Sequence, residues 1–167
     1  IYQRHPNAEM FAICQRNQES LNEIGDAFGI ERRYTDYREL LRDPDVDFVH
    51  INSPIPDHAW MSLEALKAGK HLFLEKPMAT TVEDCRKLND LAASRNLHLM
   101  VGHTFEYTAA VNKIKEIVDS GHLGEILYIS STRVNLGLFQ PDINVVWDLA
   151  PHDISIMNYV LGAAPIG

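Results

Sequence analysis

Apolar and polar positions along the first hundred residues predict strands and helices in alternation. Apolar runs of strand length occupy residues 8–14, 47–52, 71–74 and 97–101. Between and after them, apolar residues recur every three or four positions, which predicts helices at residues 18–28, 37–42, 57–68 and 81–96. Strands that alternate with helices across short loops are typical of a parallel sheet with right-handed crossovers. We therefore expect an α/β protein with a doubly wound, nucleotide-binding sheet.

The pattern changes after His103, where we place a domain boundary. Helices are predicted at residues 109–120 and 149–161, and a loop rich in Gly, Pro, Asn and Asp is predicted at residues 136–144. Residues 126–135 alternate between apolar and polar, which predicts a strand with one buried face. Residues 1–103 are thus expected to form one domain, and residues 104–167 to begin a second.

Composition narrows the class of protein. The 167 residues carry a net charge of −8 and are 46% hydrophobic, as expected for a globular protein. No apolar run reaches the length of about 18 residues needed to span a membrane, so we expect a soluble protein. Lys and Arg are scattered among carboxylates, which disfavours nucleic acid as a partner. The two cysteines lack metal-ligand spacing and indicate a reducing, cytoplasmic location.

Polar residues follow each of the four predicted strands, at the edge where open α/β sheets bind ligands. We therefore take the residues at this edge as candidates for a ligand site. They are Gln15 and Arg16, Ser53 and Pro54, Glu75, Lys76 and Pro77, and His103.

Lys76, Asp148 and His152 are the candidate reactive groups, and each has a structural alternative. A lysine at a strand end can polarise a hydroxyl or carbonyl, but a surface ion pair with Glu75 is equally compatible with the sequence. Asp148 and His152 are four residues apart, as in a carboxylate that supports an imidazole base. Alternatively, Asp148 caps the helix and His152 packs. A zinc site with His103 is the weakest reading, and we expect no metal.

Five further residues have two interpretations each. His58 either packs in the first turn of its helix or lies at a cofactor edge, and Tyr107 and Trp147 either stack on a ligand or pack in the core. Arg133 and Asn135, at the wet face or exit of the last predicted strand, either meet a polar substrate or are solvated.

The order and spacing of several motifs resemble the glucose-fructose oxidoreductase, inositol dehydrogenase and MocA family. The matching segments are residues 43–47 (DPDVD), Ser53-Pro54 with His58, residues 65–71 (ALKAGKH), Glu75-Lys76-Pro77 and residues 121–126 (GHLGEI). Residues 147–153 (WDLAPHD) resemble the Asp-x-x-x-His element found in nucleotide-sugar dehydrogenases of that family. The resemblance covers essentially the whole chain.

The resemblance implies a dinucleotide-binding Rossmann domain followed by an α/β domain with an open sheet, which binds substrate and often makes a dimer. Lys76 would contact the reacting hydroxyl and the nicotinamide ribose, His152 would exchange the hydroxyl proton, and Asp148 would orient the substrate and tune His152. Glu75 and Pro77 would shape the nicotinamide pocket, with Ser53, Pro54 and His58 along the cofactor. The implied reaction transfers a hydride between a secondary alcohol of a sugar, nucleotide-linked sugar or cyclitol and NAD or NADP.

Two departures from the family pattern change these expectations. The family's first strand and glycine-rich phosphate loop would precede Ile1, so we expect the chain alone to be inactive. Gln15 and Arg16 stand where NAD-preferring members often carry an acidic residue, which makes NADP a candidate beside NAD. Two rival functions keep the same fold: a non-catalytic dinucleotide-binding regulator, and an enzyme that retains NAD during glycoside hydrolysis or sugar–sugar exchange.

Overall fold

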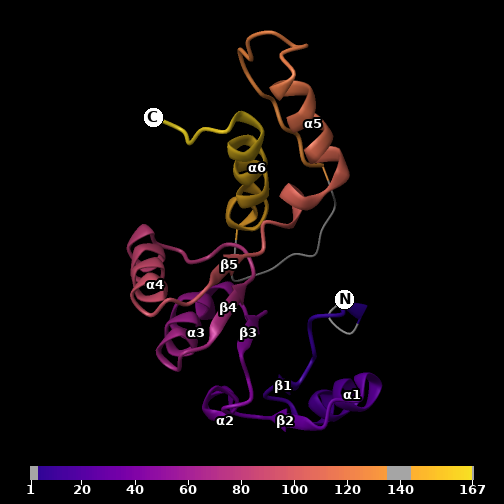
Figure 1. Cartoon of the computed structure of the whole chain (residues 1–167), viewed down its shortest axis with the longest axis vertical. Coiled ribbons are helices and arrows are strands. Elements are labelled where there is room, and N and C mark those ends of the chain that lie inside the picture. Colours follow the sequence, from indigo (N-terminus) through magenta and orange to yellow (C-terminus); the bar gives the residue numbers. More distant parts are fainter. Residues whose placement is uncertain (1–3, 135–143, 167) are drawn as a thin grey trace.

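The computed structural model describes residues 4–134 and 144–166 (Figure 1). Its strands and helices alternate, as the sequence predicts, up to the end of β5. In chain order the elements are β1 (Ala12–Cys14), α1 (Gln18–Phe28), β2 (Arg32–Tyr34), α2 (Tyr37–Arg42), β3 (Phe48–Ile51), α3 (Ile55–Lys67), β4 (His71–Leu74), α4 (Val82–Ser94), β5 (Leu99–Val101), the 3₁₀ helix η2 (Thr104–Tyr107), α5 (Ala109–Asp119) and α6 (Val145–Leu161). The sequence pattern missed β2, because this strand has three residues and lacks an apolar run.

All strand pairs are parallel, and the register of three of them brings their carboxyl ends together. β1 pairs with β2, and a second sheet has the order β3-β4-β5. In this sheet Ile51 lies opposite Leu74, and Leu74 lies opposite Val101. The residues that follow these three strands therefore emerge side by side at one edge, which is the edge the sequence assigned to a ligand site.

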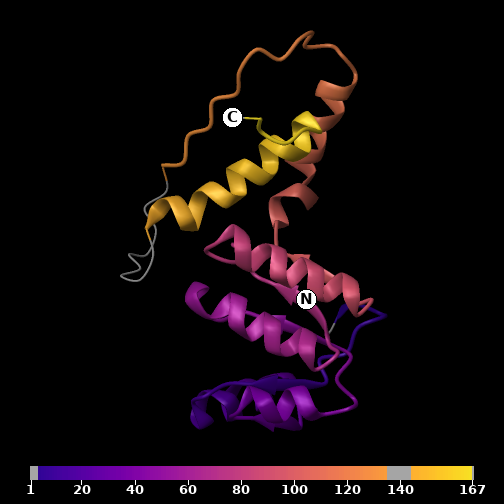
Figure 2. The same ribbon diagram turned by 90° about the vertical axis from the view of Figure 1, so that its left-hand side faces the viewer.

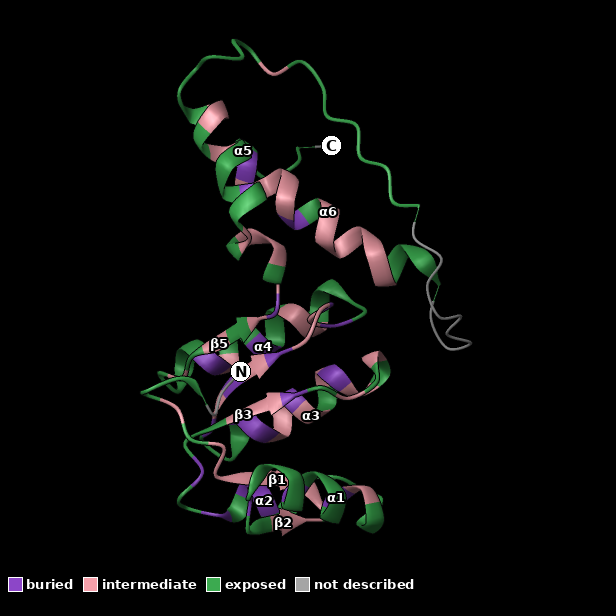
Figure 3. Ribbon diagram, turned by 90° about the vertical axis from the view of Figure 1, so that its right-hand side faces the viewer, coloured by how far each residue is buried: buried purple, intermediate pink, exposed green. Residues whose placement is uncertain are grey.

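The core lies between the β3-β4-β5 sheet and the two helices that cross over its strands. α3 and α4 pack against each other along one face of the sheet (Figure 1), and the buried residues gather where they meet it (Figure 3). Leu66 of α3, Leu74 of β4 and Leu88 of α4 are almost completely buried. Thr81 begins α4 as its N-cap, because its side chain accepts a hydrogen bond from the Asp84 amide. The packed helix pair therefore fixes the position of β4 and of the residues that follow it.

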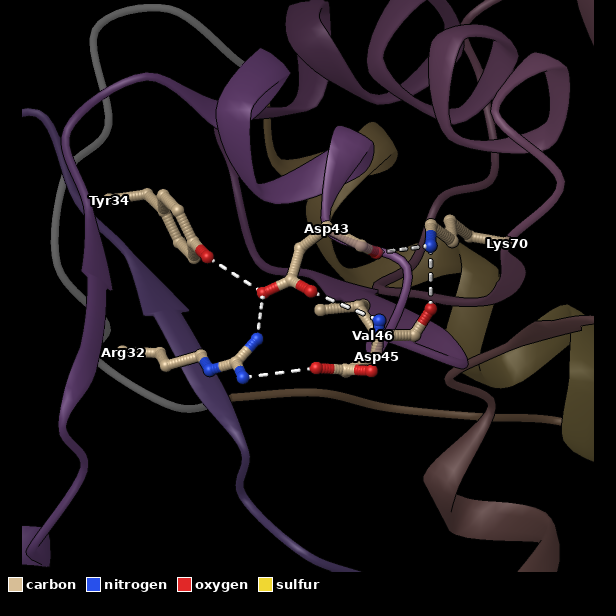
Figure 4. A network of polar contacts seen from close by, with 6 residues as sticks. All are labelled: Arg32, Tyr34, Asp43, Asp45, Val46 and Lys70. Carbon is tan, nitrogen blue, oxygen red and sulfur yellow. Dashed lines mark hydrogen bonds and ion pairs between the residues drawn. The ribbon is translucent and has the colours of Figure 1, made fainter.

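A polar network around the buried Asp43 joins β2 to the loop after α2 (Figure 4). One carboxylate oxygen of Asp43 accepts hydrogen bonds from Arg32 and from the Tyr34 hydroxyl, each at 2.7 Å. These bonds lower the pKa of Asp43 from 3.8 to about 2. Because the folded-state pKa is depressed, the stabilisation by Asp43 is complete above pH 3.8 and is lost as the pH falls toward 2.

Lys70 joins the same network from the other side. Its ammonium is buried and donates 2.7 Å hydrogen bonds to the backbone carbonyls of Asp43 and Val46 (Figure 4). Lys70 directly precedes β4, so these bonds tie the start of that strand to the loop before β3.

Gly25 allows α1 to lie against the side chain of Arg33, and we expect Gly25→Ala to destabilise the fold. A Cβ at Gly25 would collide with the Arg33 guanidinium, which Ile30 O and Asp26 Oδ1 hold at 2.7 Å each. An alanine in mid-helix ordinarily stabilises by about 0.5–1 kcal/mol, but overpacking costs about 1–3 kcal/mol, so a net loss is expected in urea denaturation. Combining Gly25→Ala with Arg33→Ala should cost less than the sum of the two; strict additivity would contradict the collision.

The chain after β5 forms a separate group of helices. α5 and α6 pack against each other and against η2, and the segment from the end of α5 runs back toward the start of α6 (Figure 2). The strand predicted at residues 126–135 is wrong for residues 126–134, which pair with no strand in the described part of the chain. A strand is defined by its neighbour's hydrogen bonds, and alternation of residues does not supply that neighbour.

Candidate active site

Lys76 leaves the carboxyl end of β4 and reaches α6. Its ammonium donates 2.7 Å hydrogen bonds to the backbone carbonyl and to Oδ1 of Asp148. The Lys76 side chain is 17% exposed, and that of Asp148 is 35% exposed. This partner answers the question that the sequence left open, because the lysine pairs with a carboxylate 72 positions away along the chain and not with the adjacent Glu75.

Asp148 and His152 lie one turn apart on α6. The helix begins four residues earlier than the sequence predicts, with Asn144 as its N-cap: the Asn144 side chain accepts hydrogen bonds from the amides of Val146 and Trp147. The alternative in which Asp148 caps the helix is therefore wrong, and the Asp148 carboxylate is left to bind Lys76. Pro151 lies inside the helix and not in its first turn.

The surroundings of His152 favour its neutral form. Burial lowers the pKa of His152 below its ordinary 6.5, and the positive charges of Lys76, Arg133 and His103 lower it further, whereas Asp148 raises it. Nδ1 of His152 is covered and has no hydrogen-bond partner among the described residues. A neutral imidazole can accept a proton from a ligand.

Two residues beside His152 were not found by sequence reasoning. The ring of Phe105, in η2, meets the His152 ring edge to face, with centroids 4.8 Å apart. Asp153 accepts hydrogen bonds from Ser131 and Arg133, at 2.9 and 2.8 Å. The adjacency of Asp153 to His152 was the one available signal. Arg133, predicted at a wet strand face, thus lies near the candidate site.

The edge beside Lys76 carries the residues predicted to border a cofactor. His58 is 1% exposed, and its ring nitrogens lie 2.7 Å from Pro77 O and 2.8 Å from Ser53 O, so it links the loops after β3 and β4. Gly102 lies so close to Glu75 that a Cβ there would lie 3.3 Å from the carboxylate.

Buried polar atoms at the same edge test whether a dinucleotide fits. Ser53 Oγ and His103 Nδ1 are both covered, and neither has a hydrogen-bond partner in the part of the chain that the structure describes. Buried polar atoms usually have partners, so two such atoms beside the strand ends fit the edge of a site for a polar ligand. These residues are compatible with a bound nicotinamide dinucleotide.

The remaining candidates lie around this edge or outside the description. Gln15 and Arg16 are exposed directly after β1, and Pro54 precedes α3. Tyr107 and Trp147 are 69% and 42% exposed, so neither packs in the core. Asn135 lies outside the described residues.

Two properties of the described residues bear on other classes of protein. Within them, no group of three His, Cys, Asp or Glu side chains is arranged to hold a metal ion. None of the helices in residues 4–134 and 144–166 has the length and apolar character needed to cross a membrane.

Parallel strands, crossover helices and a polar carboxyl edge define a dinucleotide-binding α/β protein. Residues 1–103 match the family model described as "Oxidoreductase family, NAD-binding Rossmann fold". The chain belongs to this family, the one whose motifs it resembles.

Individual relatives agree with this assignment. The chain is 31% identical to 1-carboxy-3-chloro-3,4-dihydroxycyclohexa-1,5-diene dehydrogenase from Comamonas testosteroni, over 90% of this chain and 40% of the relative. It is 28% identical to myo-inositol 2-dehydrogenase from Thermotoga maritima, over 93% of this chain and 48% of the relative. The chain thus spans less than half the length of these relatives.

A solved structure extends the likeness to three dimensions. An oxidoreductase from Agrobacterium radiobacter, in complex with NAD⁺, L-tartaric acid and magnesium, superimposes with a TM-score of 0.83 and is 28% identical to this chain. The match covers 96% of this chain and 49% of the solved one.

Proposed function

We propose that the protein carrying this chain is a dehydrogenase that moves a hydride between NAD and a secondary alcohol of a sugar or cyclitol. One observation carries the proposal: Lys76 Nζ lies 2.7 Å from Asp148 Oδ1, and His152 follows one turn later on the same helix. Membership of an NAD-binding oxidoreductase family and likeness to myo-inositol 2-dehydrogenase support this reading.

The proposed roles follow from the positions of the side chains. Bound NAD supplies the carbon that accepts the hydride. Lys76 Nζ positions the substrate hydroxyl by hydrogen bonding to its oxygen, and the neutral imidazole of His152 takes the hydroxyl proton as the carbonyl forms. Asp148 holds Lys76 and offsets the positive charge that His152 gains.

The direct test adds NAD and a series of sugars, cyclitols and nucleotide-linked sugars to the purified protein that carries this chain. Absorbance of the reduced nicotinamide should rise with at least one of these alcohols. Product without net change in the cofactor would favour the NAD-retaining alternative. Binding of NAD without reduction by any alcohol would favour the regulator.

We further propose that the cofactor site accepts NADP, because Gln15 and Arg16 place no acidic side chain after β1. A carboxylate there would repel the 2′-phosphate of NADP. Gln15→Asp should therefore weaken NADP binding about tenfold, or about 1.4 kcal/mol, and leave NAD binding unweakened, as measured by calorimetry. The matched control is Gln18→Asp, the same exchange in the first turn of α1. Equal loss of both cofactors would contradict a role in discrimination.

The finer features of the protein are proposals of the same kind. A nucleotide-linked sugar is one candidate substrate, because residues 147–153 resemble the corresponding element of nucleotide-sugar dehydrogenases. Tyr107, Trp147 and Arg133 are proposed to contact the substrate, as is Asn135, and we propose a homo-oligomer. Residues 1–103 are proposed as the cofactor domain, and residues 104–167 as the beginning of the substrate domain.

A further inference from the structure

Three side chains in contact with one another, those of Asp153, Arg133 and Phe105, link α6 through the extended segment 126–134 and η2 to His152. Asp153 is adjacent to His152 in sequence, but its carboxylate is bound to Arg133 and Ser131. Residues 126–134 pair with no described strand. These two hydrogen bonds therefore hold the segment beside α6. The proton transfer proposed above does not require this arrangement.

Arg133 is linked to the His152 ring through the ring of Phe105. Nε of Arg133 donates a 2.8 Å hydrogen bond to Asp153 Oδ2. The guanidinium carbon lies 4.9 Å from the centroid of the Phe105 ring, and that ring lies 4.8 Å from the His152 ring at an interplanar angle of 72°. Side chains of Arg133 and Asp153 are 27% and 22% exposed, so the ion pair is partly shielded from water.

We propose that Arg133 is a positioning residue for His152: Asp153 holds the guanidinium over Phe105, and Phe105 in turn fixes the orientation of the imidazole. This role rests on the proposed function, because it gives the imidazole a fixed direction for proton transfer. It is additional to the substrate contact proposed above for Arg133, since the guanidinium acts here through Phe105.

The charges around His152 give the second part of the argument. Lys76 comes from the end of β4, His103 from the end of β5, Arg133 from the extended segment and Asp148 from the same helix. Three of these groups favour the neutral imidazole, whereas Asp148 opposes them, and the Asp153 carboxylate also interacts with the His152 charge. Removing Arg133 should therefore make His152 easier to protonate, in addition to loosening its ring.

Arginine suits this position better than lysine does. A guanidinium is planar, so it can stack on an aromatic ring while its edge bonds a carboxylate. An ammonium would keep the charge but not the flat contact with Phe105. Arg133→Lys thus separates the electrostatic effect on His152 from the ordering of the two rings.

The test is a proton NMR titration of His152 in the protein that carries this chain, without cofactor or substrate. Its imidazole signal is assigned by its loss in His152→Gln. In the parent chain we expect a midpoint below 6.5 and a cross-peak between the His152 and Phe105 rings. Arg133→Met should raise the midpoint, because it removes a positive charge beside the imidazole, and should weaken the cross-peak. Arg133→Lys should largely keep the midpoint but weaken the cross-peak.

The matched control is Arg38→Met. Arg38 also stacks over a ring, that of Tyr37, and also pairs with an aspartate, Asp36, but it lies in α2, away from α6 (Figure 1). It should leave the titration of His152 unchanged. A parental midpoint and cross-peak in Arg133→Met would overturn the proposal. If Arg133→Met does not fold, a parental cross-peak in Arg133→Lys would overturn it instead.

The outcome of this experiment is independent of the outcome of the test of function. A changed titration in a protein that reduces no NAD would leave the positioning role standing and reject the dehydrogenase. An unchanged titration in an active dehydrogenase would reject the positioning role alone.

Discussion

Lys76→Ala and His152→Ala should each lower the turnover of the alcohol that the parent protein oxidises by about a hundredfold or more. Lys76 is the cation at the proposed reacting edge, and His152 is the imidazole whose neutral form the surroundings favour. The measurement is the initial rate of nicotinamide reduction in the protein that carries this chain. Lys67→Ala is the matched control, since Lys67 pairs with Glu64 on the exposed side of α3. Near-parental turnover in both site variants would reject the assigned roles.

The same roles predict the direction of the pH dependence. His152 must be neutral to accept a proton, and its pKa is lowered below 6.5, so the oxidation rate should rise with pH along an acid limb centred below 6.5. In Lys76→Ala the loss of a positive charge should raise the pKa of His152. The acid limb of the pH–rate profile, measured on the activity that remains, should therefore move to higher pH. An acid limb that moves to lower pH would contradict this electrostatic account.

Lys70→Met should lower the free energy of unfolding by about 3 kcal/mol, because it removes a charged donor and leaves two carbonyls without it. Those carbonyls, of Asp43 and Val46, receive their 2.7 Å hydrogen bonds from a buried ammonium. Urea denaturation followed by circular dichroism measures the change.

Lys113→Met provides the comparison for Lys70. Lys113 is 62% exposed and pairs with Glu116 on the surface of α5, where such pairs are worth about 0–1 kcal/mol. Equal denaturation midpoints for the two variants would show that burial of the Lys70 ammonium contributes no stability.

The alternating part of the fold could be predicted because its signals are local. An apolar run such as that of β4, or the cap that Thr81 provides to α4, is complete within a few neighbouring residues. β2 and residues 126–134 show the opposite case. A short polar strand exists because β1 pairs with it, and an alternating segment remains unpaired when no described strand lies beside it.

The candidate site, like the fold, could be predicted from the sequence only in part. The spacing of Asp148 and His152 already placed them on one helix, but only the folded chain shows that Lys76 binds Asp148. The roles of Phe105 and Asp153 depend on contacts across η2, the extended segment and α6. No periodicity within one element encodes such contacts.

The ion pair between Lys76 and Asp148 also makes the two halves of the chain depend on each other energetically. Lys76 belongs to the sheet that carries the proposed cofactor edge, whereas Asp148 belongs to the helix that carries His152. A ligand that orders Lys76 or Asp148 also restricts the other residue of the pair. A second ligand that binds on the other side then loses less conformational entropy. Binding at the cofactor edge should then raise the affinity for a ligand at α6. By thermodynamic reciprocity, binding at α6 should raise the affinity at the cofactor edge by the same factor.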